Sequence, residues 1–209
     1  PVYTKYEMPD WNDSDIFPVI GQIVSKGDGN LWIATENAGL LYLDKSTNKI
    51  NTFTSNQTDS NRFPVNIKSL CFSENKLLIG KRDEGISILD LKTNTLKQQS
   101  LRPDDVKRDP IFTIVPFGNE FLLATSYGLI KYNLDGSSTF LIGPEDLNLN
   151  RKYLYISSVY VDSEEMIWFG VRGKGLFSYD IKSKKIKDYG NKLDFANPLK
   201  INEVSCILE

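Results

Sequence analysis

The sequence predicts an all-β protein built from four similar units, each with four antiparallel strands. Three features predict it: a repeated phrase, a second repeated pair of apolar residues, and short strand-like apolar runs. The phrase is an apolar pair, a turn, a Gly-Leu or Gly-Ile pair and a closing apolar or aromatic position. Its four copies lie at intervals of 46, 45 and 45 residues, a regularity typical of repeat architectures. The first residues of the four pairs are Leu31, Leu77, Leu122 and Ile167.

The second repeated feature is a pair of aliphatic residues, three positions apart, upstream of each phrase. The five pairs are Ile20 and Ile23, Ile67 and Leu70, Ile111 and Ile114, Ile156 and Val159, and Ile201 and Val204. Residues 1–209 therefore form a single repeat segment. It holds repeats at approximately 18–54, 65–100, 111–141 and 156–190, and the start of a fifth at 201–209.

The apolar runs are short, rich in β-branched and aromatic residues, and bounded by Gly, Asn, Asp and Ser, which favours strands over helices. In the first repeat we expect strands at 20–25, 31–35, 39–44 and 49–54. Four antiparallel strands in about 45 residues is the size of one β-propeller blade. The predicted fold is a partial β-propeller of four four-stranded antiparallel blades, with extra strands at 2–7 and 201–208.

Three kinds of repeated residue have structural explanations. A glycine opens each third strand after a tight turn, where a positive φ or a close backbone approach is expected. Trp32 and Trp168 each offer a large apolar face to a neighbouring blade. Aspartates recur at turns, where the side chain accepts hydrogen bonds from nearby backbone N–H groups. The glycines are Gly39, Gly85, Gly128 and Gly175, and the aspartates are Asp28, Asp44, Asp90, Asp162 and Asp180.

Composition excludes several function classes. The net charge is −2, so no strongly basic surface exists and nucleic acid is not an expected partner. No apolar run is long enough to span a membrane. The chain has no His, which removes Ser-His-Asp and Cys-His nucleophile systems and the commonest metal ligand. We expect no catalytic residue, no metal and no cofactor, and no disulfide between Cys71 and Cys206, because they fall in blades that are not adjacent.

The arginines share a location in the predicted fold. Each lies either between repeats or in the turn between the second and third strands, and in a meander blade these connections emerge on one face. The planar guanidinium binds carboxylate and sulfate groups bidentately and stacks on flat rings, and the same face carries the longest loops. The candidate ligand-binding residues are Arg62, Arg82, Arg102, Arg108, Arg151, Arg172, Tyr127 and Tyr153, with Phe63 and Tyr155 as further ring surfaces. The alternative is that the arginines only pair with nearby acids such as Asp83, Asp104, Asp109 and Glu145.

Two phrases, SKGDGNLWIATENAGLLYLD and VDSEEMIWFGVRGKGLFSYD, carry a family resemblance. The repeat resembles the regulator-propeller repeats in the sensor region of hybrid two-component histidine kinases. Repeats two and three depart from the pattern, with Leu-Leu in place of Leu-Trp, so the likeness there rests on spacing. The resemblance implies a non-catalytic, periplasmic sensor segment that responds to a polysaccharide fragment. It also implies an immunoglobulin-like domain, a membrane helix, a kinase and a response regulator downstream of these residues. Only those downstream segments would then contact the membrane.

Two further expectations concern an alternative function and the association of chains. A propeller enzyme acting on glycans with carboxylate or Tyr catalysis is the alternative function, and two or three converging acids would favour it. The apolar end strands at 2–7 and 201–208 would have unpaired edges, which add to edges of other chains. We therefore expect self-association, most simply a dimer in which the N-terminal strand of one chain meets the C-terminal strand of another.

Overall fold

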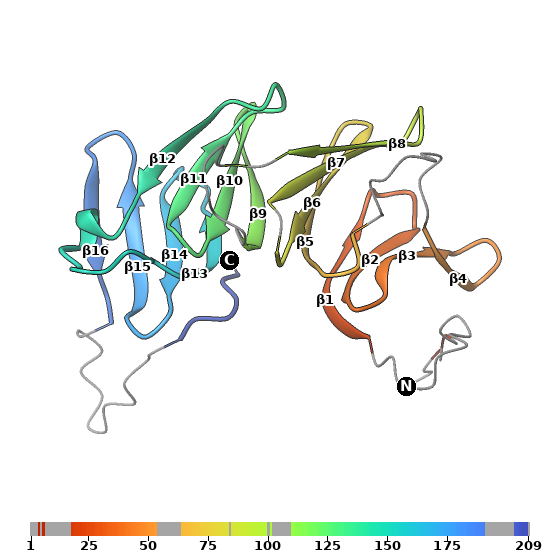
Figure 1. The fold of residues 1–209 in the computed structure, drawn as a ribbon, viewed down its shortest axis with the longest axis horizontal. Coiled ribbons are helices and arrows are strands. Elements are labelled where there is room, and N and C mark those ends of the chain that lie inside the picture. Colours follow the sequence, from red (N-terminus) through yellow and green to blue (C-terminus); the bar gives the residue numbers. More distant parts are fainter. Residues whose placement is uncertain are drawn as a thin grey trace. The chain divides into compact units, whose positions relative to one another are not determined.

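The computed structural model describes residues 4, 6, 18–53, 64–83, 85–99, 101, 110–190 and 203–208. Within these residues sixteen strands form four sheets, each of four antiparallel strands in sequence order (Figure 1). The predicted all-β fold with four four-stranded blades is confirmed. None of the helical structure in the described ranges is long and apolar enough to cross a membrane. The chain divides into two compact units, Pro1–Arg108 and Asp109–Glu209.

Unit 1, Pro1–Arg108, contains the first two blades. Blade 1 consists of β1 (Val19–Ser25), β2 (Leu31–Glu36), β3 (Gly39–Asp44) and β4 (Lys49–Thr52). Blade 2 consists of β5 (Ile67–Ser73), β6 (Lys76–Lys81), β7 (Ile86–Asp90) and β8 (Thr95–Gln99). The four strands predicted for the first repeat all form, with small differences at their ends.

Unit 2, Asp109–Glu209, contains the other two blades. Blade 3 consists of β9 (Ile111–Phe117), β10 (Glu120–Thr125), β11 (Leu129–Tyr132) and β12 (Ser138–Ile142). A 3-10 turn, η1 (Glu145–Leu147), precedes blade 4. Blade 4 consists of β13 (Ile156–Val161), β14 (Ile167–Val171), β15 (Gly175–Asp180) and β16 (Lys185–Asp188).

The register of blade 3 corrects one detail of the predicted repeat. Phe121 pairs with Tyr132, as Leu31 pairs with Leu43 in blade 1, so Phe121 rather than Leu122 begins the third apolar pair. The cause is the turn between β10 and β11, which is one residue shorter than its counterpart in blade 1. When one turn is a residue shorter and a loop elsewhere in the repeat is longer, the interval between repeats stays the same. The interval alone therefore does not reveal the shorter turn.

The upstream aliphatic pairs lie where one blade packs on the next. In unit 1, Ile67 and Leu70 of β5 share a core cluster with Trp32 of blade 1. In unit 2, Ile156 and Val159 of β13 share a cluster with blade 3. The pair in blade 1 behaves differently: Ile20 is 50% exposed, whereas Ile67 at the same repeat position is 0% exposed. In blade 2, packing against blade 1 therefore buries this pair.

The two tryptophans differ in their environment. Trp32 packs across the blade boundary as predicted, with its ring 6.4 Å from that of Phe72 in β5. Trp168 instead contacts Tyr189 of its own blade at 5.3 Å, and its Nε1 donates a hydrogen bond of 2.7 Å to Asp162. The expected contact of Trp168 with a neighbouring blade stays a prediction.

The turn residues fulfil the expected roles. All four strand-opening glycines have positive φ. Each of the five recurring aspartates accepts a hydrogen bond from a backbone N–H two to four residues ahead. In one of them, Asp90, the N–H groups of Thr93 and Lys92 hold the pKa of the carboxyl below its usual value. These carboxylates are therefore structural caps of turns.

The chain ends depart from the prediction. Residues 203–208 do not form a strand, so the extra strand expected at 201–208 is absent from its described part. Val204 nevertheless lies against blade 4, because the hydroxyls of Ser157 and Ser158 donate to its carbonyl oxygen at 2.8 and 2.9 Å. Of the strand expected at 2–7, only Thr4 and Tyr6 are described, and neither is in a strand. The single-segment boundaries and the fifth repeat stay predictions.

The two cysteines are free thiols, as expected. Cys71 in β5 is buried, and this burial raises its pKa to about 11. A thiol with so high a pKa is unreactive at neutral pH, because the thiolate is the nucleophilic form. Cys206 is exposed in the segment after blade 4.

Candidate functional site

Three tyrosines form a continuous run of ring contacts at one end of the strands of unit 2. Tyr127 lies in the turn between β10 and β11, and its ring centroid is 5.2 Å from that of Tyr153. The centroid of Tyr153 is in turn 6.0 Å from that of Tyr155, and both belong to the connection from β12 to β13. The structure thus brings Tyr127 and Tyr153 together, as the predicted arrangement of the connections required.

The turn that carries Tyr127 is fixed by Thr125. The Thr125 hydroxyl accepts a hydrogen bond from the Tyr127 N–H at 3.1 Å and donates one to the Gly128 carbonyl at 2.9 Å. Thr35 makes the second of these bonds in blade 1, donating to the Gly39 carbonyl at 2.7 Å. Tyr127 itself is buried and forms the base of the ring cluster.

The exposure of the other two tyrosines follows from local backbone geometry. Tyr153 and Tyr155 are each 38% exposed, whereas Leu154 between them is 0% exposed. Side chains of extended backbone alternate between faces, so burial of Leu154 in the core directs both tyrosines to solvent. The N–H of Arg172 donates to the Tyr155 carbonyl at 2.9 Å and ties the segment to the turn after β14.

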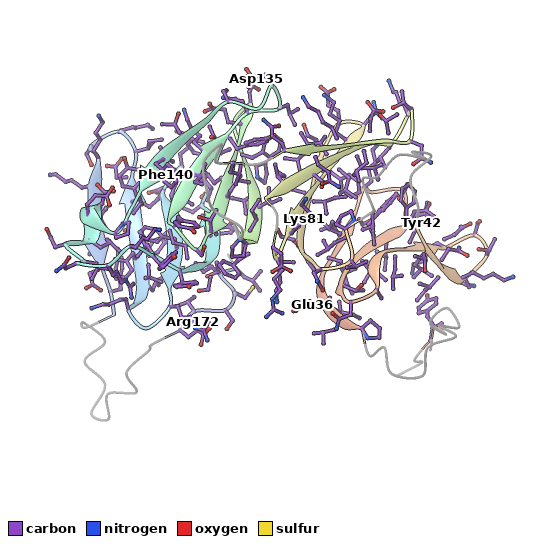
Figure 2. All side chains as sticks on the ribbon, viewed as in Figure 1. Glu36, Tyr42, Lys81, Asp135, Phe140 and Arg172 are labelled. Carbon is purple, nitrogen blue, oxygen red and sulfur yellow. The ribbon has the colours of Figure 1, made fainter. Side chains whose placement is uncertain are left out.

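One cationic side chain contacts an exposed ring, and two arginines lie in the adjoining connections. Lys152 places its Nζ 5.7 Å from the Tyr153 ring centroid, within the range of a cation–π interaction. Arg151 is exposed, and no ion pair joins it to another described residue. Arg172 is exposed as well (Figure 2), and its Nε lies 3.9 Å from Glu203, a long and solvated ion pair of little strength. We call Tyr127, Arg151, Lys152, Tyr153, Tyr155 and Arg172 the tyrosine surface.

Arg82, the arginine of unit 1 that the structure describes, has a different role. Glu36 at the end of β2 accepts hydrogen bonds from Lys68 of β5 and from Arg82 in the turn after β6, so it links the two blades. Burial alone would raise the pKa of Glu36, but the bonds and charges of Lys68 and Arg82 outweigh it and lower that pKa. Arg82 therefore follows the acid-pairing alternative, with Glu36 as the acid rather than Asp83.

We expect Glu36→Gln to lower the free energy of unfolding by about 1 kcal/mol at pH 7, because it leaves two cations without their carboxylate. Since the folded-state pKa of Glu36 is depressed, its contribution is present above the unfolded-state pKa of about 4.3 and is lost as pH falls through the folded-state value. Urea unfolding of the unchanged protein and of Glu36→Gln, between pH 3 and pH 7, measures the difference in their free energies of unfolding. The range spans the unfolded-state pKa of Glu, roughly 4. A difference that stays constant over the range would contradict the role of the charge.

Several candidate residues lie outside the described residues. They are Arg62, Arg102, Arg108 and Phe63, together with the acids Asp104 and Asp109. Lys152 is a member of the site that sequence reasoning missed. Lysines are spread over both faces of the predicted blades, so neither the residue type nor the position of Lys152 indicated a binding role.

The recurring aspartates and Glu36 have structural partners. The recurring aspartates bond to turn N–H groups, and Glu36 is held by Lys68 and Arg82. No group of three or more His, Cys, Asp or Glu among the described residues is placed to hold a metal ion. The arrangement at the tyrosine surface suits binding: rings can stack on apolar sugar faces, and the cations can pair with anionic substituents.

No protein-family model matches the sequence, and no curated protein matches it either. Solved structures do match in fold. One is named as the extracellular domain of a hybrid two-component system, BT3049, from B. thetaiotaomicron, with a TM-score of 0.64 and 21% identity. A second, named for the hybrid two-component system BT4673 of the same organism, gives a TM-score of 0.57 and 18% identity. A catalytically inactive virginiamycin B lyase from Staphylococcus aureus with quinupristin gives 0.61 and 14%.

The matches cover most of this chain but differ in how much of the other protein they span. They cover 81% and 82% of this chain against the two extracellular domains, and 85% against the lyase. The chain spans only 21% and 28% of the two extracellular domains, and 57% of the lyase. At these identities the likeness concerns the fold, and the fold alone carries more than one function.

Proposed function

We propose that the chain is a non-catalytic segment of an extracellular or periplasmic sensor domain in a two-component signalling protein, and that it binds a polysaccharide fragment. The observation that carries the ligand is the tyrosine surface: two neighbouring exposed rings, with Lys152 over one of them and the N–H of Arg172 bonded to the carbonyl of the other. The signalling role is supported by two fold neighbours, both named as extracellular domains of hybrid two-component systems. The kinase would lie in another part of the same protein.

The chemistry of the tyrosine surface narrows the class of saccharide. Tyr153 and Tyr155 offer apolar ring faces, on which the C–H face of a sugar can stack. Arg151, Lys152 and Arg172 add positive charge, and two of them carry the guanidinium fork that binds carboxylate or sulfate bidentately. The ligand that fits both features is an oligosaccharide with uronic acid or sulfate groups.

Calorimetric titration with uronic acid oligosaccharides, sulfated oligosaccharides and neutral oligosaccharides tests this. We expect an anionic member to bind and Tyr153→Ala to weaken binding roughly two- to tenfold, since a ring contact is worth about 0.5–1.5 kcal/mol. The matched control is Phe140→Ala, which removes an exposed ring of β12 in the same unit. Equal affinities of both variants, or no binding by any anionic saccharide, would refute the proposal.

The enzyme alternative has less support. It would need carboxylates or Tyr placed for acid and base work, and the described carboxylates in the recurring turns are held as caps. The lyase neighbour is similar in fold at 14% identity, and its chemistry does not extend to this chain on that basis. Incubation with the bound saccharide, followed by chromatography, distinguishes the two, because only an enzyme would shorten it.

Self-association remains a proposal, and β1 is the surface that supports it best. β1 is an edge strand of its sheet, and its residues Val19, Ile20 and Ile23 are at least half exposed. An apolar edge strand is prone to pair with another chain. We expect sedimentation velocity to detect concentration-dependent association, and Ile20→Lys with Ile23→Lys to suppress it. A monomer at every concentration would contradict this.

A further inference from the structure

Within each unit, the first strand of one blade bonds to the first strand of the next blade. In unit 1 the side-chain oxygen of Gln22 in β1 accepts a hydrogen bond of 2.7 Å from the N–H of Leu70 in β5. In unit 2 the hydroxyl of Thr113 in β9 donates to the carbonyl of Ser157 in β13 at 3.3 Å. Both bonds join a side chain of one first strand to the backbone of the next first strand. A first strand therefore has one side that receives the following blade and one side that meets the preceding blade.

On blade 4 the receiving side is occupied by residues 203–208, which form no strand and which we call the strap. The hydroxyls of Ser157 and Ser158 in β13 both donate to the carbonyl of Val204, so the strap makes the bond of a first strand. Val204 also lies close to Gly170 of β14, where an added Cβ would be 2.7 Å from the Val204 Cβ. Four of the six residues of the strap are exposed. The strap therefore has the hydrogen bonds of a first strand with little of its packing.

On blade 1 the side of β1 that meets a preceding blade is largely uncovered. Ile20 and Ile23 are each 50% exposed. Their repeat counterparts in β5, Ile67 and Leu70, are 0% and 1% exposed. β1 therefore presents the apolar pair of a first strand to solvent.

The backbone of Ile23 points away from the sheet of blade 1. Ile23 pairs with Ile33 of β2, and Leu70 pairs with the repeat counterpart of Ile33 in β6. The Leu70 N–H bonds to Gln22, outside its own sheet. In an antiparallel strand the N–H and C=O of one residue point to the same side. The N–H and C=O of Ile23 therefore lie on the outer edge of β1, where they can bond to another blade.

We propose that blade 4 of one copy receives β1 of a second copy, and that the strap competes with β1 for this place. The inference rests on the self-association proposed above, and it names the partner surface and its regulation. The two serine hydroxyls of β13 then donate to the carbonyl of Ile23 in place of that of Val204. The strap is thus the competitor of the contact between copies, whereas the sequence predicted that the C-terminal strand itself makes that contact.

Packing favours β1 over the strap as the occupant of blade 4. In unit 1, Trp32 shares a core cluster with Ile67 and Leu70 of the next blade. Trp168 has the same position and register in blade 4, and it is only partly buried. β1 brings the same apolar pair to Trp168 that β5 brings to Trp32. A docked β1 therefore buries more apolar surface than the strap does.

The strap has the advantage of being part of the same chain as blade 4. Its local concentration is therefore high, and it occupies blade 4 at low protein concentration. β1 of a second copy replaces it as the protein concentration rises. Because β1 and blade 4 are different surfaces, the contact is heterologous. A dimer in which each copy gives its β1 and receives the other β1 leaves neither surface open.

Cross-linking between two kinds of copy identifies the partner surface. One copy carries Ile20→Cys in β1, and the other carries Ser157→Cys in β13. In unit 1, Ile67 and Gly21 are the repeat counterparts of these two positions. A Cβ added at Gly21 would lie 3.1 Å from the carbonyl oxygen of Ile67, so the two positions are neighbours where one blade receives the next.

Both substitutions are made together with Cys206→Ser, which removes the exposed native thiol. Burial raises the pKa of Cys71 to about 11, so this thiol does not react. With a short bismaleimide we expect a covalent dimer only when the two kinds of copy are mixed. In the control mixture Phe140→Cys, at an exposed position of β12, takes the place of Ser157→Cys. Equal cross-linking in the control, or cross-linking of Ile20→Cys copies with each other, overturns the proposal.

Val204→Asp tests the competition by the strap. The substitution removes the apolar contact of Val204 with Gly170 and places a charge there. We expect sedimentation velocity to show association about three- to tenfold tighter than that of the unchanged protein, because the strap then competes less well. Ser205→Asp is the control, since it adds the same charge at an exposed residue of the strap. Unchanged or weaker association of Val204→Asp, or equal tightening by Ser205→Asp, overturns the proposal.

The outcomes separate this inference from the proposed function. A cross-link in the mixture, together with tighter association of Val204→Asp, supports the inference. Association that Ile20→Lys with Ile23→Lys suppresses, but that gives no cross-link in the mixture, overturns this inference and leaves self-association through β1 standing. A monomer at every concentration, for Val204→Asp as well, overturns both. Saccharide binding at the tyrosine surface is measured separately and depends on neither result.

Discussion

Replacing Ile67 with Ala is expected to lower the free energy of unfolding of unit 1 by about 2–5 kcal/mol. Ile67 is fully buried in the cluster where blade 2 packs against blade 1, so its loss leaves a cavity between the blades. Ile20 has the same residue type and the same repeat position but is half exposed. Ile20→Ala should therefore cost about 1 kcal/mol or less.

Urea unfolding, followed by the fluorescence of the buried Trp32 in a background with Trp11→Phe and Trp168→Phe, measures both changes in the unit that contains them. The comparison controls for residue type, secondary structure and side-chain volume, because only the covering blade differs. Equal destabilisation by the two substitutions would mean that something covers Ile20 in solution. That result would agree with association through β1, and the same measurement at several protein concentrations would then show a concentration dependence.

Structural features that depend only on residues of the same repeat could be predicted from the sequence. The strands, the strand-opening glycines and the capping aspartates depend on residues within a few positions of each other, and period-2 and turn patterns report such local structure. The grouping of Tyr127 with Tyr153 was also predictable, because meander topology places their two connections at one end of the strands. The exposed position of Tyr155 follows from the alternation around buried Leu154.

Features that depend on the neighbouring blade could not be predicted in this way. Arg82 bonds to Glu36, which is 46 residues away in the adjacent blade, and nothing in the local sequence indicates that pairing. Asn94 lines a cleft only because the rings of blade 1 stand opposite. Ile20 matches Ile67 in sequence and differs only in what covers it. The repeat pattern predicts the strands and turns of each blade. The contacts between blades determine the burial and the bonding partners of a given position.

Replacing Gly128 with Ala is expected to destabilise unit 2 by about 3 kcal/mol or more, the sum of backbone strain and a steric clash. Gly128 has φ of 142°, and a Cβ there would lie 2.0 Å from the carbonyl oxygen of Ile142. No flexible side chain can relieve the contact, because the opposing atom belongs to the backbone. The control is Gly118→Ala, at φ of 58° with open space around the added atom, which should cost only about 1 kcal/mol of strain.

A change at Gly128 also affects the candidate site, because Gly128 follows Tyr127 directly. The Gly128 carbonyl accepts hydrogen bonds from both the N–H and the hydroxyl of Thr125, which shape the turn. If Ile142 is pushed away, the connection that carries Tyr153 and Tyr155 moves with it, since that connection begins directly after β12. Gly128→Ala should therefore lose saccharide affinity at temperatures where the unit is still folded by circular dichroism, and Gly118→Ala should keep it. Unchanged affinity in a folded Gly128→Ala protein would mean that the geometry of the turn does not position the tyrosine surface.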